Sequence, residues 1–251
     1  MYESIAALVE RMASDLAKLD AERDGRRHFH ATYLRTTRAV AEEIDRGGFR
    51  DGAWLERWDL VFAGLYLDAL EADLAGRAVP RPWRVAFDAA RERTDLPPVR
   101  HVLLGMNAHI NYDLPQALIA VITPAEFDDP DVRRVREADH RHVDDVLLAR
   151  VGAEDDELAG QSTRSLLDRL LAPANRAATK RILTEARAKV WRNTAALDAA
   201  RRAGPDRYAA VLAELEALCA VRVADLTAPG QVLLKLARRG FGVVLPGAGP
   251  A

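Results

Sequence analysis

The pattern of apolar positions is helical over nearly the whole chain. From Ile5 to Leu19 the apolar residues share one face of a 3.6-residue repeat, and a second repeat runs from Gly25 to the stop at Gly47–Gly48. Gly and Pro residues punctuate the repeats, and no segment alternates with the period of two that a half-buried strand would show. The pattern predicts an all-α, single-domain bundle of about ten helices around a central apolar helix.

The caps and breaks between helices set the expected boundaries: Asp51 is predicted to cap one helix, and Asp128-Asp129-Pro130 to begin another. Residues 1–240 are predicted to form the helical domain and residues 241–251 a Gly/Pro-rich tail. An acidic stretch at about 152–162 is predicted to be looser than its surroundings. The expected helices cover about 3–19, 25–46, 51–76, a short segment from Pro82, 99–122 with a kink at Pro115, 130–150, a short segment ending at Leu171, 173–202, 205–223 and 231–239.

The central segment, residues 99–122, carries the first candidate chemistry. It is apolar except for four polar side chains in its middle: Asn107, His109, Asn111 and Asp113. At 100° per residue His109 and Asp113 share one face, and the two asparagines share the opposite face. Burying four hydrogen-bonding side chains costs several kcal/mol unless each finds a partner. The segment therefore predicts either a structural polar network or a site.

Two His/Asp pairs suggest a metal. His109 and Asp113, at i and i+4, could chelate one divalent, zinc-like ion. On the helix after Pro130, the phase of the apolar stripe places Asp139 inside the stripe and His142 beside it, with His140 and Asp144 toward solvent. The metal hypothesis therefore uses His109, Asp113, Asp139 and His142. The alternative for each pair is a local hydrogen bond.

The second helix adds two more candidates. His30 flanks its apolar stripe and Tyr33 lies within it, so both could face the same cavity as His109. A histidine satisfied within the core is the alternative for His30. The candidate catalytic residues are thus His109, Asp113, His30, Tyr33, Asn107 and Asn111.

Composition narrows the class of protein. Among the 251 residues, 36 Lys and Arg nearly balance 38 Asp and Glu, which argues against a nucleic-acid partner. The single cysteine, Cys219, can form no internal disulfide or thiolate cluster. We see no signal peptide and no apolar run of the ~20 residues that span a bilayer. We expect a cytoplasmic protein that binds a small molecule and has no membrane span; the sequence does not predict its oligomeric state.

The segment Leu-Gly-Met-Asn-Ala-His-Ile-Asn-Tyr-Asp-Leu, residues 104–114, resembles the motif of an uncharacterised family of bacterial all-helical proteins. The resemblance extends over about residues 25–200. It includes a His-x-x-Tyr formed by His30 and Tyr33, and a Val-Trp-Arg at 190–192. It implies an all-helical fold but no particular activity.

A weaker resemblance points to zinc-dependent phospholipases C and single-strand nucleases. Their Gly-x-x-x-His-x-x-x-Asp pattern, followed by Pro, is similar to Gly105, His109, Asp113 and Pro115, and their later His-x-x-x-Asp/Glu to His140 and Asp144. The further His that this family carries shortly after the first Asp is missing at 116–119, as is the ligand exposed by signal removal. The resemblance therefore implies one or two metals rather than three.

Three functions remain open from the sequence. The first is a small-molecule enzyme that uses a metal-bound water to hydrolyse an ester or phosphoester. The second is a metal-free His/Asp acid–base enzyme, a lyase or cyclase of specialised metabolism. The third is a non-enzymatic helical binding protein in which the buried polar residues only join the helices together.

Overall fold

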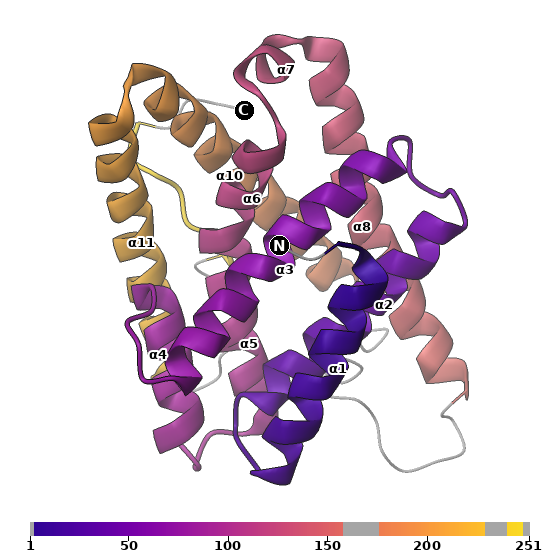
Figure 1. Cartoon of the computed structure of the whole chain (residues 1–251), viewed down its shortest axis with the longest axis vertical. Coiled ribbons are helices and arrows are strands. Elements are labelled where there is room, and N and C mark those ends of the chain that lie inside the picture. The colour runs from indigo at the N-terminus through magenta and orange to yellow at the C-terminus, as the bar shows by residue number, and fades with distance from the viewer. Residues whose placement is uncertain (1–2, 158–175, 229–239, 248–251) are drawn as a thin grey trace.

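A computed structural model describes residues 3–157, 176–228 and 240–247. All regular secondary structure in these ranges is helical, which confirms the all-α bundle (Figure 1). The elements are α1 (Ile5–Ala21), α2 (Arg27–Asp45), α3 (Gly52–Leu74), α4 (Arg81–Glu92), α5 (Pro98–Ala108), η1 (His109–Asp113), α6 (Leu114–Val121), α7 (Pro124–Asp128), α8 (Pro130–Glu157), α10 (Arg176–Ala203) and α11 (Pro205–Thr227). No helix among these residues is long and apolar enough to cross a membrane.

Side-chain caps fix several helix starts where the sequence predicted them. Ser4 accepts a hydrogen bond from the Ala7 N–H at the start of α1, and Asp51 accepts one from the Trp54 N–H at the start of α3. Before α8, the Asp129 carboxylate accepts from the N–H groups of residues 131 and 132. These caps satisfy N–H groups that have no partner within the helix.

Two parts of the predicted helix map need correction. The short helix α7 was not predicted, although Thr123 and Glu126 form a reciprocal capping box at its start. Helix α8 continues to Glu157, so the first part of the acidic stretch 152–162 is helical rather than loose. The expected helices at 231–239 and ending at Leu171, and the expected start at Pro173, lie outside the described residues.

The predicted central helix is one continuous run of α5, η1 and α6, packed against α2, α3, α4, α10 and α11. Its middle turn is π-helical: the Leu114 N–H bonds the carbonyl of His109, five residues back. Pro115 follows directly and has no N–H to donate, which removes one bond that would otherwise hold the α-helical register. The irregularity thus falls on the turn that holds His109 and Asp113.

The end of the described chain is extended and buried. Residues 240–247, yellow in Figure 1, run beside α11 from the centre of the bundle outward. Phe241, Val243 and Leu245 are 4%, 8% and 3% exposed. This part of the expected Gly/Pro-rich tail therefore packs its apolar side chains against the helices.

Candidate functional site

The turn His109–Asp113 holds a buried hydrogen-bonded dyad. The His109 Nδ1 lies 2.8 Å from the Asp113 Oδ2, and the Trp83 indole N–H of α4 donates to the same oxygen over 2.9 Å. His109 and Asp113 are 3% and 2% exposed, and Trp83 is fully buried. Because two donors converge on this oxygen, we assign the shared proton to Nδ1, which leaves the lone pair on the His109 Nε2.

Aromatic rings surround the imidazole of His109. The Phe62 ring lies parallel to it with centroids 3.7 Å apart, and the Tyr33 ring meets it edge-on at 4.5 Å. Phe29, Tyr66 and Trp83 complete the enclosure with centroids 6.0 Å or less from that of His109. We call this set of five rings the aromatic box. It keeps bulk water from the imidazole.

The box shifts the acid–base properties of the dyad. Burial lowers the pKa of His109, although the hydrogen bond and charge of Asp113 act in the opposite direction. Burial also raises the pKa of Asp113, against the effects of His109 and the Trp83 N–H. His109 is therefore a neutral imidazole at pH 7, as a general base must be.

Two polar atoms at this place, the His109 Nε2 and the Tyr33 hydroxyl, have no hydrogen-bond partner. The Asp59 Oδ2 of α3 also has none, and the charge of Asp59 acts on Tyr33. All three side chains are buried. Burial and the charges of Asp59 and Asp113 raise the pKa of Tyr33, so its hydroxyl keeps its proton. Burial, with a contribution from Glu56, raises the pKa of Asp59 to about 7. A buried polar atom without a partner calls for an explanation, and a bound ligand or water molecule is one.

Our sequence reasoning missed Asp59. The sequence pattern could have indicated it, since Asp59 lies four residues after Leu55 and three before Phe62, inside the apolar stripe of α3. A single carboxylate in the middle of such a stripe needs a reason, as the four polar residues of the central helix did.

Three of the candidate catalytic residues have structural partners instead. The His30 Nε2 contacts the Met12 carbonyl at 2.8 Å and its Nδ1 contacts the Tyr66 hydroxyl at 2.9 Å, so both ring nitrogens are satisfied. Asn107 and Asn111 point to the opposite side of the central helix from the dyad and bind the backbone of the C-terminal segment. Of the predicted set, the structure places only Tyr33 beside His109 and Asp113.

The four predicted metal ligands lie in separate places. Asp139 accepts the backbone N–H groups of residues 50 and 51, just before α3, over 2.8 and 2.9 Å. His142 is half-buried and contacts Glu43 at 2.9 Å. Within the residues that the structure describes, no group of three or more His, Cys, Asp or Glu side chains could hold a metal. The donor atoms of the two pairs therefore do not form one site.

The predicted orientation of His140 toward solvent is wrong. His140 is 2% exposed, its ring lies 5.3 Å from that of Trp58, and its Nδ1 accepts the Trp191 indole N–H over 3.1 Å. The prediction considered only the apolar stripe of its own helix, whereas the long α10 supplies a polar partner at that position. Asp144, predicted to share that orientation, pairs with Arg187 of α10.

We expect His140 to make the protein less stable in acid. Burial lowers its pKa well below 6.5, so the folded state resists a proton that the unfolded chain takes up as the pH falls through 6.5. Stability should fall by about 1–2 kcal/mol between pH 7 and pH 5.5 from this group. In His140→Gln, the free energy of unfolding measured with urea should depend less on pH over this range. His142→Gln, at a half-buried position, should show the same pH dependence as the wild type. An unchanged dependence in His140→Gln would contradict the assignment.

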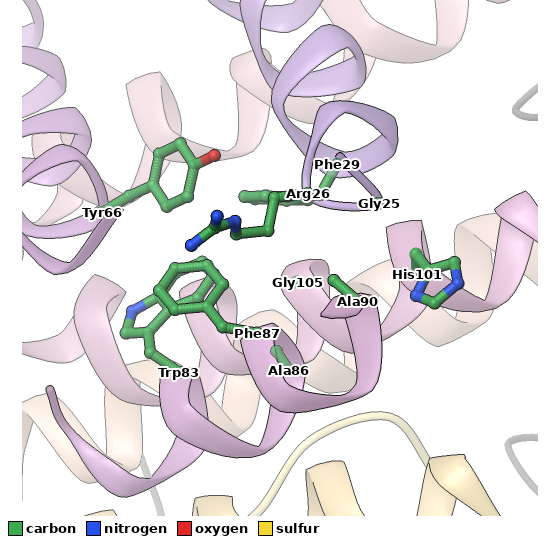
Figure 2. Close-up of a pocket in the computed structure, with 10 residues that line it drawn as sticks. All are labelled: Gly25, Arg26, Phe29, Tyr66, Trp83, Ala86, Phe87, Ala90, His101 and Gly105. Atoms are coloured by element: carbon green, nitrogen blue, oxygen red, sulfur yellow. The ribbon is translucent and has the colours of Figure 1, made fainter. Parts of the chain in front are cut away.

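A small pocket adjoins the aromatic box (Figure 2). Phe29, Tyr66 and Trp83 line both the box and the pocket, while His109 does not line the pocket. Arg26 extends across it toward Tyr66, with its charge paired to Asp24 and Asp73. On the far side, Gly105 leaves room for Phe29, because a Cβ there would lie 2.3 Å from the Phe29 ring. The rings thus separate His109 from a pocket with apolar walls.

Comparison with family models identifies the chain. Residues 5–229 match a family of unknown function, DUF5995, so the chain belongs to that family. The match covers the central helix and every element that contributes to the aromatic box. We found no significant similarity to a curated protein or to a solved structure.

Proposed function

We propose that this member of the DUF5995 family is a metal-independent acid–base enzyme that acts on a small, largely apolar molecule. His109 is the proton-transferring residue. The observation that carries the proposal is the unpartnered Nε2 of a buried imidazole whose other nitrogen is held by Asp113. This arrangement orients an imidazole and fixes its tautomer for general-base catalysis.

Each neighbour has a role in this proposal. Asp113 orients the imidazole and stabilises it when Nε2 takes a proton, and the Trp83 N–H holds the carboxylate in place. The Tyr33 hydroxyl, which keeps its proton, can donate a hydrogen bond to an oxygen of the substrate. The five rings favour a substrate with a flat apolar framework. In this proposal the substrate enters from the pocket of Figure 2, which shares Phe29, Tyr66 and Trp83 with the aromatic box, and Phe29 swings aside to admit it.

The geometry favours this function over metal-dependent hydrolysis. The Asp113 Oδ2 is committed to His109 and Trp83, and the second His/Asp pair is bound elsewhere. A catalytic zinc site uses three protein ligands, and among the described residues no three His, Cys, Asp or Glu side chains lie together in a group that could hold a metal.

The proposal can be tested with 5-nitrobenzisoxazole, a flat apolar probe whose ring opens when a base removes one proton from carbon. We expect turnover above that of free imidazole at equal concentration. His109→Gln should abolish this excess, and Asp113→Asn should reduce it by about 10²-fold or more because the imidazole loses its orienting partner. His142→Gln should leave it unchanged.

The pH profile of the wild-type protein gives a second readout that needs no variant. Because the pKa of His109 is lowered, the base form persists below pH 6.5, and the rate should fall only at lower pH. A rate that equals free imidazole at every pH, or that survives in His109→Gln, would overturn the proposal.

A further inference from the structure

The C-terminal segment is held in the manner of a bound peptide. Between the Gly240 carbonyl and the Leu245 N–H, seven backbone groups are each bonded by a side chain of the bundle. In most segments of folded proteins, backbone groups bond chiefly to other backbone groups. Here, the partners are Arg222, Glu185, Asn107, Asn111, Lys189 and Asn193.

Two asparagines each bond two backbone groups of the segment. Asn111 donates to the Phe241 carbonyl over 3.3 Å and accepts from the Val243 N–H over 3.2 Å. Asn193 donates to the Val243 carbonyl over 3.0 Å and accepts from the Leu245 N–H over 2.9 Å. Each amide therefore pairs with a carbonyl and with the N–H two residues later, a repeat that only an extended chain can match.

The apolar side chains follow the same two-residue repeat. Phe241, Val243 and Leu245 are buried, whereas the intervening Val244 is half-buried. Phe241 packs in the cluster that includes Phe29 and Trp83, and the other two pack against α10 and α11. Gly242 is confined by Lys189, since a Cβ there would lie 2.7 Å from the lysine side chain. Backbone bonds with alternate side-chain pockets are the features of extended-peptide recognition.

We propose that the surface formed by α5, η1, α10 and α11 is a peptide-binding groove for an extended chain with apolar residues at alternate positions. Its ligand in this protein is the tethered segment 240–245. The segment leaves and re-enters the groove while the helical bundle remains folded. Asn193 is the principal residue for recognition, because it is fully buried and both polar atoms of its amide bond the ligand.

Native-state hydrogen exchange of the intact wild-type chain tests the release of the segment. The amides of Val243 and Leu245 should exchange through a local opening, with rates that hardly change at low urea concentration. The amide of Leu104, in the fully buried part of α5, should exchange only through global unfolding and respond steeply to urea. The same steep response at Val243, Leu245 and Leu104 would show that the segment is an inseparable part of the core and would overturn the proposal.

Binding in trans tests the specificity of the groove. In the full chain with Phe241→Ser and Leu245→Ser, the weakened tether should let a fluorescein-labelled peptide of residues 240–247 bind saturably. Adding Asn193→Ala should weaken this binding about tenfold or more, because two hydrogen bonds are lost. A peptide with serine in place of Phe241 and Leu245 should not compete. Absence of saturable binding, or equal binding with and without Asn193, would refute the proposed groove.

Discussion

Replacing Asp59 by asparagine is expected to stabilise the protein by about 2–4 kcal/mol at pH 8. The unfolded chain ionises this carboxyl near 3.8, whereas burial raises its pKa to about 7 in the folded state. Between these values the folded state holds more protons, so stability falls as the pH rises and the loss is complete above about pH 7. Asparagine has the shape of the protonated acid and carries no charge.

Urea unfolding at pH 4.5 and pH 8 measures the effect. Asp59→Asn should differ from the wild type by less than about 1 kcal/mol at the lower pH, and the gain should develop as the pH rises. Asp139→Asn is the matched control, because both oxygens of that buried carboxylate accept backbone N–H groups. The control should lose about 1.5–3 kcal/mol. A loss of stability in Asp59→Asn at pH 8 would show that the carboxylate has a partner in solution.

Trp83→Phe is expected to destabilise the protein by about 3–5 kcal/mol. Trp83 is fully buried, and its indole N–H is one of the two donors to the Asp113 Oδ2. Trp54→Phe supplies the comparison, since Trp54 is equally buried but its indole nitrogen has no hydrogen-bond partner. That variant should lose the packing contribution and part of the contact between the Trp54 ring and the Arg136 guanidinium above it, together about 1–2 kcal/mol.

A double-mutant cycle isolates the hydrogen bond. Combining Trp83→Phe with Asp113→Asn should give a coupling energy of about 1.5–3 kcal/mol, the range for a bond to a charged group. The free energies of unfolding of the wild type, the two single variants and the double variant, measured with heat or urea, give the coupling energy. Equal losses in Trp83→Phe and Trp54→Phe, together with additive effects in the cycle, would mean that the indole does not support the carboxylate.

The fold was predictable because local signals agreed with one another. Apolar stripes, the Asp51 and Asp129 caps, and the Gly and Pro stops all act within a few residues, which is the range over which a sequence can be interpreted directly. The helix α7 was missed because its capping box spans only a few residues between two longer elements.

The site was only partly predictable because its partners are distant in sequence. The phase of the central helix identified His109 and Asp113, but the enclosing rings come from α2, α3 and α4. The helical phase of α8 predicted wrongly that His140 faces solvent, because the partner that buries it, Trp191, is 51 residues away in the sequence. Asn107 and Asn111 were recognised as unusual, yet nothing local showed that residues 241–245 would pair with them.

The docked C-terminal segment also affects the order in which parts of the protein fold during synthesis. Asn107 and Asn111 emerge from the ribosome more than 130 residues before the backbone groups that bond them. During that interval the Asn107 and Asn111 side chains lack the backbone partners of residues 241–243, and closing so long a loop is slow. Folding of the His109 turn is therefore completed only once residues 241–243 have been produced, well after the helices that enclose the imidazole.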